Sequence, residues 1–483
     1  MTYNEFTADL RSRVEATRPT RWVRFAIVAL IFLLWVAWMG NWWLALFLFL
    51  LFDIYITGYI PFTWWKKSDN KAVKAIMSWV DAIVYALVLV YFVFAFLGQN
   101  YQIPSSSLEK TLLTGDYLFV NKTIYGPRVP MTPVNFPLVH NTLPIFNTNS
   151  YLEKPSLSYH RLKGIRKVEN GDIVVFNFPA GDTVMSKVSN PDYYTLVKSL
   201  GRNAVINNKA TFGDVIYRPV DRRENYVKRA VGLPGQRIKI VDGTIYIDNV
   251  AEKTPENVQY NYIFQVKGQG LTDDEWNKLG VANEDIHFVS ELVQDSALAR
   301  VNGYDVNPDG TVPMVYVTPL TKGMIDELQS AGRISHILRL PQQPDGMLFP
   351  DYISDSWTID NYGGDDGILI PAKGMKLKIT DDNWNIYDRA IRVYENNPSA
   401  KMVNGTLYIN DKPVDEYEFK MDYYFMMGDN RHNSLDSRYW GFVPEDHIIG
   451  SPWRVMISFD KDKSIFNGGI RWNRIFRDAN PDK

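Results

Sequence analysis

The chain has 483 residues, more than one hydrophobic core usually supports, so at least two structural units are expected. Its 52 basic and 54 acidic residues leave a net charge of -2, which gives no reason to expect a nucleic acid as a partner. It contains no cysteine, and its six histidines never show the i, i+4 pairing of a helical metal site. We therefore predict no metal site and no organic cofactor.

Apolar stretches dominate the first hundred residues. Residues 25–62 contain one acid, Asp53, and no base, and a break at Gly40 and Asn41 divides them into two arms. Because a helix needs about 20 residues to cross a bilayer, we predict a membrane-spanning hairpin over 23–62 and a third membrane helix over 75–97, which contains Asp81. The stretch is far longer than the core of a cleaved signal peptide. For the two acids, helix packing is favoured over a role in proton relay.

Positive charge is distributed unevenly around these segments. Arginines precede the hairpin, lysines follow it, and the residues directly after 97 carry no base. Lys and Arg near the ends of membrane spans remain in the cytoplasm. We therefore expect 1–22 and 63–74 in the cytoplasm, and everything after residue 98 on the periplasmic side of the cytoplasmic (inner) membrane.

Beyond residue 98 the pattern changes to short apolar or alternating runs separated by Gly, Asp, Asn and Pro, which is typical of strands and turns. Asp242-Gly243 predicts a hairpin over 237–249, and 403–411 has a similar sequence. The polar segments 131–165 and 185–222 are predicted as long surface loops. Other strands are expected at 116–126, 171–179, 225–235 and 453–460.

The expected fold class is mainly β, with N-terminal transmembrane helices followed by an antiparallel, barrel-like β domain. Its core would be formed by residues 98–250 and 402–466, and 467–483 would be a tail. The intervening 251–401 is richer in Asp, Asn and Gly and has helix-like pieces at 272–280 and 322–333. We predict it to be an inserted α+β cap.

Three segments carry residues that could do chemistry: "IPSSSLEKTLLTGD" (103–116), "YVKRAVGLPG" (226–235) and "GDNRHNSLDSRYWGFVP" (428–444). A serine attacks once a neighbour accepts its proton, and a lysine amine can do so if burial lowers its pKa. On a strand, Lys228 shares a face with Tyr226 and Ala230, whereas Arg229 points the other way. Lys228 can then be buried while Arg229 stays solvated, although the spacing alone also fits an exposed lysine.

Together with "GDIVVFNFP" (171–179), these segments resemble the conserved boxes of the bacterial type I signal peptidases, membrane-bound Ser/Lys proteases that remove signal peptides from exported proteins. The first box of that family reads roughly I-P-S-x-S-M-x-P-T-L-x-x-G-D. Here Leu108 stands where Met is usual and Lys110 where Pro is usual. Leu for Met conserves volume, and Lys110 is expected as a solvated side chain at the edge of a cleft. Residues 251–401 show no usable resemblance.

The resemblance implies a role for each matching residue. Ser107 would be the nucleophile and Lys228 the general base, with the Ser105 hydroxyl and the Ser107 backbone N–H as oxyanion donors. Ser434 would orient the lysine. Asp436 and Arg438 would form a structural ion pair. The substrate pockets would be lined by Tyr101, Ile103, Leu112, Leu118, Tyr226 and Val227. Independently of the family, two serines on alternate residues of an extended segment can face one cleft, which leaves Ser106 dispensable.

Two other serine-based catalytic motifs match parts of the sequence. "SLEK" fits the S-x-x-K pattern of penicillin-binding enzymes, but K-T-G is missing and the only S-D-N, residues 68–70, lies in the predicted cytoplasmic loop. His432, Ser434 and Asp436 could form a Ser-His-Asp triad, yet triads are usually assembled from distant segments. His432 is therefore expected to be a surface loop residue.

The expected function is a membrane-bound serine endopeptidase that cleaves signal peptides after small residues of the Ala-X-Ala type through an acyl-enzyme. Its partners would be the signal peptides of preproteins and the lipid bilayer. The competing hypothesis is a catalytically inactive, membrane-anchored protein that binds signal peptides or assembly partners. The intact set of Ser105, Ser107, Lys228 and Ser434 argues against it.

Overall fold

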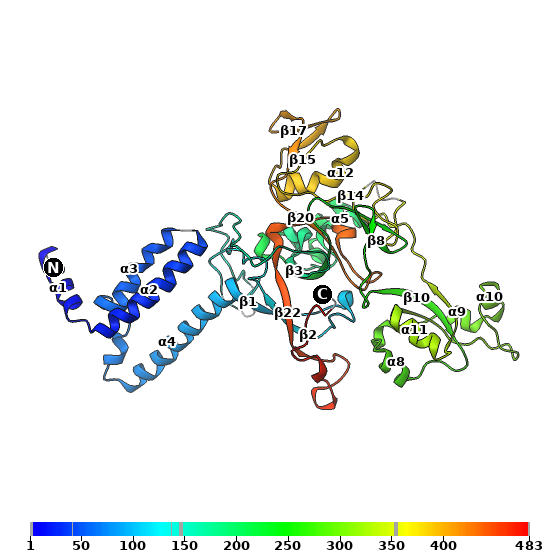
Figure 1. The fold of residues 1–483 in the computed structure, drawn as a ribbon, viewed down its shortest axis with the longest axis horizontal. Helices are drawn as coiled ribbons and strands as arrows, with labels where there is room; N and C mark the ends of the chain where they lie inside the picture. The colour runs from blue at the N-terminus through cyan, green and yellow to red at the C-terminus, as the bar shows by residue number, and fades with distance from the viewer. Residues whose placement is uncertain (1–2, 41, 137, 144–147, 352–355, 482–483) are drawn as a thin grey trace. The chain divides into compact units, whose positions relative to one another are not determined.

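The computed structural model describes residues 3–40, 42–136, 138–143, 148–351 and 356–481 (Figure 1). Asn41, which the sequence places in the break between two apolar arms, lies outside these residues. The chain forms two compact units. The first comprises Met1–Leu97 and Gly126–Ile165, and the second comprises Gly98–Tyr125 and Arg166–Lys483.

The first unit contains the apolar helices. Helix α2 begins with a proline, which is preorganised for a first turn, and ends at Gly40 with φ of 65°. Among the described residues, two helical segments are long and apolar enough to cross a membrane, Pro19–Met39 and Lys71–Leu97, the latter being α4 with the helical turn that follows it. The apolar segment Trp42–Thr57 is shorter. The predicted second arm is therefore shorter than a typical span. The α-helices of this unit are α1 (Tyr3–Glu15), α2 (Pro19–Met39), α3 (Phe47–Phe52) and α4 (Lys71–Phe92).

A seven-stranded antiparallel sheet forms the centre of the second unit, and the predicted mainly-β class is confirmed. Its central strand β3 is buried at every residue, whereas β2 alternates between buried and half-buried positions. The strands predicted at 116–126, 171–179, 225–235 and 453–460 correspond to β2, β3, β6 and β22 of this sheet. Their order across the sheet is β1 (Gly98–Gln102), β2 (Asp116–Asn121), β22 (Ile448–Ser458), β3 (Ile173–Asn177), β6 (Asn225–Gly232), β20 (Tyr423–Met427) and β21 (Val443–Pro444).

The predicted hairpin is present as β7 (Arg237–Val241) and β8 (Thr244–Ile247). Asp242 and Gly243 both have positive φ, 47° and 76°, as a tight two-residue hairpin turn requires. Asn404 and Gly405 repeat these values at 48° and 76° between β16 (Lys401–Val403) and β17 (Thr406–Ile409). The similar sequences therefore form two hairpins of one design.

Residues 251–401 include a second sheet covered by short helices. Its apolar core contains Phe264, Trp276 and Tyr316, whose rings pack edge to face or tilted. The two predicted helices correspond to α8 and α11. The sheet has the order β11 (His287–Phe288), β12 (Val315–Thr321), β10 (Gln259–Val266) and β13 (Ile334–Arg339), and the helices are α8 (Asp273–Leu279), α9 (Ser290–Gln294), α10 (Ser296–Val301) and α11 (Lys322–Ser330).

Most of the remaining small elements, though not the exposed strand β9, pack against an apolar cluster that includes Ile238, Tyr423 and Phe425. They are helix α12 (Asp381–Arg389), helix α13 (Ser437–Trp440), and strands β9 (Val250–Ala251), β14 (Ile368–Leu369), β15 (Lys376–Leu377), β18 (Lys412–Val414) and β19 (Tyr417–Glu418).

One predicted loop is wrong. Residues 185–222 contain α5 (Tyr193–Leu200), α6 (Arg202–Asn207), α7 (Lys209–Phe212) and β5 (Val215–Tyr217), which pairs with β4 (Thr183–Met185). Asp192 caps α5 by accepting backbone N–H groups, and Tyr193 and Leu196 bury a small cluster with Val205. These helices are too short for a clear apolar period in the sequence.

Candidate active site

Ser107 lies in a short turn directly after the edge strand β1. Ser105 is extended, with φ of -137° and ψ of 159°, and the chain then enters the 3₁₀ turn η5 (Ser106–Leu108). The sequence predicts one extended segment for Ser105 and Ser107. In the structure the chain is extended only as far as Ser105, and Ser107 lies in the turn. Leu108, 1% exposed, anchors the turn in an apolar cluster with Leu118. The Ser107 side chain is held on this anchored turn and is itself buried.

The loop after β20 holds this turn in place. The backbone N–H of Asn430 donates to the Ser107 carbonyl at 3.1 Å, and the Thr111 hydroxyl donates to Asp429 at 2.7 Å. A Cβ added to Gly428 would lie 2.5 Å from the Ser107 carbonyl oxygen and 2.3 Å from Ser434 Oγ. Only glycine permits so close an approach, so Gly428 lets the loop pack directly on the turn that carries Ser107.

Lys228 lies on β6, opposite Val174 of β3, and is 4% exposed. Burial lowers the pKa of Lys228 to about 8, and Arg438 adds to this effect, whereas Asp436 and Asp429 oppose it. Its amine makes no hydrogen bond or ion pair within the described part of the chain. An amine in this state is readily neutral and free to accept a proton.

One cavity of about 480 Å³ brings these groups together, since Ser105, Ser107 and Lys228 all line it. Ser105 Oγ lies 3.5 Å from Ser107 Oγ, and residues of η5 and β6 approach within 8 Å of each other between Cα atoms. Ser106 instead lines a separate cavity of about 210 Å³. The two outer serines thus share a cleft with the lysine, and the middle one faces elsewhere.

The apolar walls of this cavity come mainly from residues that the sequence predicts for them. Ile103 and Leu118 are buried, and Val227 is half-buried. Leu112 is completely buried in the adjoining core and is not among the lining residues. The predicted residues that line the cavity are Tyr101, Ile103, Leu118, Tyr226 and Val227, and those that the sequence did not indicate include Val175, Asn190, Asn225, Asn433 and Leu435.

The Asp436–Arg438 pair lies buried beside this site. Arg438 donates to both Asp436 oxygens, at 2.8 and 2.7 Å, and the Gly428 N–H donates to Asp436 at 3.1 Å. Burial alone would raise the pKa of Asp436, but Arg438 and Lys228 hold it below its usual value. Ser434 Oγ is buried and has no hydrogen-bond partner among the described residues, so its role as the residue that orients Lys228 stays a prediction.

Arg229 is buried, whereas the sequence predicted a solvated side chain. It is 2% exposed and forks onto Asp429, with nitrogen–oxygen distances of 2.8 and 2.7 Å. The expected alternation holds, because Arg229 and Lys228 use different faces of β6, but the loop after β20 covers the arginine face. A bidentate, buried partner makes this burial tolerable.

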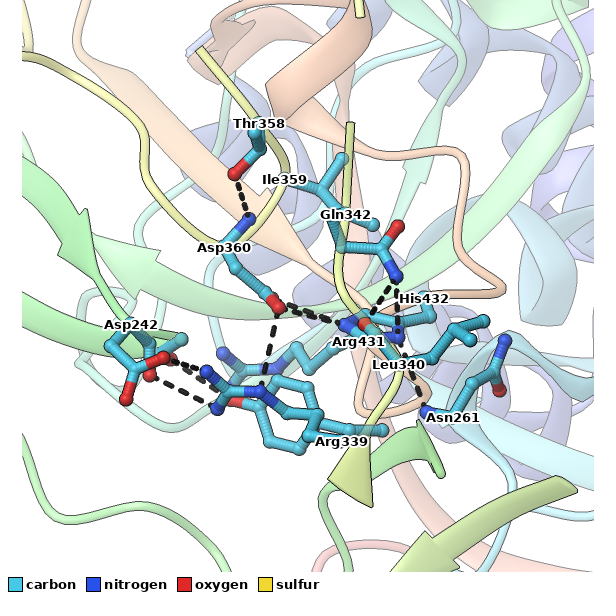
Figure 2. Close-up of polar contacts among 12 residues, drawn as sticks. Asp242, Asn261, Arg339, Leu340, Gln342, Thr358, Ile359, Asp360, Arg431 and His432 are labelled. Carbon is cyan, nitrogen blue, oxygen red and sulfur yellow. Dashed lines mark hydrogen bonds and ion pairs between the residues drawn. The ribbon is translucent and has the colours of Figure 1, made fainter. Parts of the chain in front are cut away.

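The side chain of His432 is also buried, contrary to the expected surface position, and Figure 2 shows its polar contacts. Its Nε2 lies 3.1 Å from both Asp360 oxygens, and its Nδ1 accepts the backbone N–H of Asn261 at 3.2 Å. Residues of the 251–401 segment therefore cover the ring and engage both of its nitrogens. This arrangement leaves no ring nitrogen for a triad with Ser434. The described residues contain no group of three or more His, Asp or Glu that could hold a metal ion.

Lys110 likewise contradicts the expectation of a solvated side chain. Its Nζ donates to the carbonyl of Leu279 at 3.0 Å and to that of Gly280, at the C-terminal end of α8. Burial lowers the pKa of Lys110. Because the amine is bound to α8, the arrangement does not fit the S-x-x-K pattern, in which the lysine serves the serine one turn away.

Comparison with known proteins identifies the family of this chain. The family model described as signal peptidase, peptidase S26, matches residues 76–313 and 417–456, which contain all four boxes. A signal peptidase I of Helicobacter pylori (strain J99) is 42% identical over 410 residues, covering 83% of this chain and 90% of that protein. The signal peptidase I of Buchnera aphidicola (subsp. Acyrthosiphon pisum) is 23% identical over 417 residues, covering 85% and 83%.

A crystal structure of a signal peptidase I from Enterococcus faecalis is 14% identical, covers 60% of this chain and 98% of that chain, and has a TM-score of 0.18. From the family match, the class of protein is a serine peptidase, and thus a hydrolase. The chain belongs to the signal peptidase family, peptidase S26, whose members cleave signal peptides.

Proposed function

We propose that this chain is a membrane-bound endopeptidase in which Ser107 is the nucleophile and Lys228 the general base. The observation that carries the proposal is the single cavity lined by both residues, with the pKa of Lys228 lowered to about 8 by burial. A general base works best when its pKa is near the working pH. The other basic side chain of the same strand, Arg229, is occupied by Asp429.

In the proposed reaction Lys228 takes the Ser107 proton as the hydroxyl attacks the carbonyl after residue -1 of the signal peptide. The Ser105 hydroxyl and the Ser107 N–H donate to the oxyanion, an interaction that typically contributes 10²- to 10³-fold per donor. Lys228 then passes the proton to the leaving amine and activates the water that hydrolyses the acyl-enzyme. The products are the cleaved signal peptide and the mature protein, and water is the only other reactant.

The walls of the cavity support a preference for small side chains at positions -1 and -3. Ile103, Leu118 and Val227 give the cavity apolar walls, against which small apolar side chains can pack. Strand β1 forms one edge of the main sheet. A signal peptide of the Ala-X-Ala type could add as a further extended strand, which places alternate side chains on one face.

Anchoring in the membrane is part of the proposal. It is supported by the apolar helices Pro19–Met39 and Lys71–Leu97 and by the arrangement of basic residues around them. We place the β-rich unit on the periplasmic side of the inner membrane, where preproteins emerge. The proposed partners are signal peptides and the lipid bilayer.

The test is cleavage of a preprotein with an Ala-X-Ala site by the full-length protein in detergent. Ser107→Ala and Lys228→Ala should each lower kcat by at least about 10³-fold. Ser106→Ala, whose side chain faces the other cavity, should cleave like the wild type. Cleavage by Ser107→Ala at the wild-type rate would refute the assignment. A wild-type protein that binds the preprotein without shortening it would instead establish the binding-only function.

A further inference from the structure

The turn that carries Ser107 is held from two directions. On one side, the loop after β20 bonds to the Ser107 carbonyl and to the Thr111 hydroxyl. On the other side, Lys110 reaches the end of α8, more than 160 residues further along the chain. The second contact involves the 251–401 segment. The expectation that this whole segment lacks resemblance to the family is wrong, because the family model matches it as far as residue 313 and so includes α8.

The chemistry of the α8 end suits an ammonium group. Helix α8 ends at Gly280, whose φ is 66°, and its last carbonyls have no partners within the helix. These carbonyls carry the negative end of the helix dipole. The Lys110 Nζ donates to two of them, those of Leu279 and Gly280. The contact is therefore directional as well as electrostatic.

The junction is partly buried, because Glu109 and Lys110 are both half-buried. Burial lowers the pKa of Lys110, and it raises the pKa of its neighbour Glu109 to about 7, with Asp285 also raising it and Lys110 opposing. Glu109 and Gly280 line the small cavity of about 210 Å³ between the turn and α8. A charged hydrogen bond in such surroundings is stronger than one in water.

The sheet that carries α8 has its own connections to the core, so α8 can serve as a fixed point. At the start of β10 the Gln259 N–H donates to the Asp429 carbonyl at 2.9 Å, and its carbonyl accepts the Arg431 N–H at 2.9 Å. Asp360, from the same 251–401 segment, pairs with the buried His432 (Figure 2). The segment is thus bonded to the loop that holds Ser107 as well as to the turn itself.

The backbone at Lys110 has a conformation that is unusual for a residue other than glycine. Its φ of 71° lies in the left-handed region, which is strained for a residue with a side chain. Proline, which fixes φ near -65°, cannot adopt it. The residue found in place of the family's usual proline therefore shapes the turn differently and directs its side chain to α8.

We propose that Lys110 is a positioning residue, and that its docking onto the end of α8 sets the position of Ser107 for attack. The inserted sheet β10–β13 with α8 then contributes to catalysis without touching substrate. This inference rests on the proposed role of Ser107 as nucleophile.

The first test replaces Lys110. Lys110→Ala keeps the backbone but removes the ammonium, so we expect kcat to fall about tenfold, because small misplacements of a reacting group are costly, while KM changes less than about twofold. Lys110→Arg, which can still donate to both carbonyls, should restore most of the turnover. A purely structural role would lower the thermal midpoint without this split between kcat and KM and without rescue by arginine.

The second test alters the other partner. A Cβ at Gly280 would lie 3.2 Å from Lys110 Nζ, so Gly280→Ala should displace the ammonium and reproduce the loss of kcat. Gly332, at the end of α11 in the same segment, has the same φ of 66° and nothing within 4 Å of its Cβ position. Gly332→Ala therefore carries the same backbone strain and should leave kcat unchanged. The comparison of Gly280→Ala with Gly332→Ala also tests the proposal if Lys110→Ala does not fold.

Ser107→Ala is measured alongside these variants, so that two failures remain distinct. Wild-type kcat in both Lys110→Ala and Gly280→Ala, with Ser107→Ala inactive, would overturn the role of Lys110 and leave the proposed function intact. An active Ser107→Ala would overturn the proposed function, and the positioning role with it.

Discussion

Lys228 and Arg229 are neighbours on one strand, and both are buried, yet they are suited to different tasks. Arg229 is matched by a carboxylate, with two hydrogen bonds to Asp429. Lys228 has only longer-range carboxylates near it, so desolvation dominates and its neutral form is favoured. The difference comes from what each face of β6 meets, because one face is covered by the loop after β20 and the other opens onto the cavity.

The pH dependence of cleavage should follow the neutral form of Lys228. Because the pKa of Lys228 is lowered to about 8, kcat/KM should rise about tenfold per pH unit below that value and level off above it. Initial rates between pH 6 and 10 on one preprotein would measure this limb. A flat profile would contradict a lysine base.

Removing the buried amine should stabilise the fold while abolishing activity. The pKa of Lys228 in the folded protein, about 8, lies below the 10.5 of an unperturbed lysine, so the charged form is disfavoured in the native state. A pKa shift of this size corresponds to a cost of about 3 kcal/mol. This cost is fully present below pH 8 and disappears as the pH rises to about 10.5. Lys228→Met should therefore raise the thermal midpoint at pH 7, with a gain that shrinks toward pH 10.5. An unchanged or lowered midpoint at pH 7 would contradict this expectation.

At the scale of elements, the loop after β20 organises the site. It supplies the Gly428 contact, the Asn430 hydrogen bond to Ser107 and the carboxylate of Asp429, which serves both Arg229 and Thr111. All of these groups lie within three consecutive residues. The loop therefore couples the lysine strand to the serine turn through short, buried contacts.

Gly428→Ala tests this coupling. The new methyl group would meet the Ser107 carbonyl and Ser434, so either the turn or the loop must shift. We expect kcat to fall at least about tenfold. Gly346 is a suitable control, because its Cβ position has nothing within 4 Å and its φ lies outside the left-handed range. Wild-type turnover in Gly428→Ala would show that the close approach is not needed.

The strands and the chemical segments could be predicted from the sequence because their signals are local. Apolar runs bounded by turn residues indicated β2, β3, β6 and β22, and Asp-Gly indicated the β7–β8 hairpin. The surroundings of single side chains could not be predicted in the same way. Arg229, His432 and Lys110 are covered by segments 72 to 200 residues away in the chain. No local period reports such partners, and charged residues are exposed by default.

For the whole molecule, the division proposed from the sequence places 98–250 and 402–466 in one core around the inserted 251–401. The neighbouring strands β6 and β20 come from these two parts and pair directly. Helices α2 and α4 belong to the other unit, which contains the apolar segments. The proposed topology concerns how this unit lies in the membrane.

That topology predicts accessibility from one side only. If the residues after 98 lie outside the cytoplasm, protease added to intact spheroplasts should digest them, whereas 1–22 and 63–74 should be protected until the membrane is permeabilised. A tag at either end of the chain, followed by immunoblotting, would report both regions. Complete protection of the region after residue 98 would reverse the proposed orientation.

The pairing of β6 with β20 has a consequence for biosynthesis. When the ribosome has produced Lys228, both reactive side chains exist, but the loop that holds them, from Gly428 onward, has not yet been translated. If Ser107 and Lys228 act as proposed, a nascent chain would remain inactive until this loop has been made, by which time its apolar N-terminal helices would long since have been synthesised.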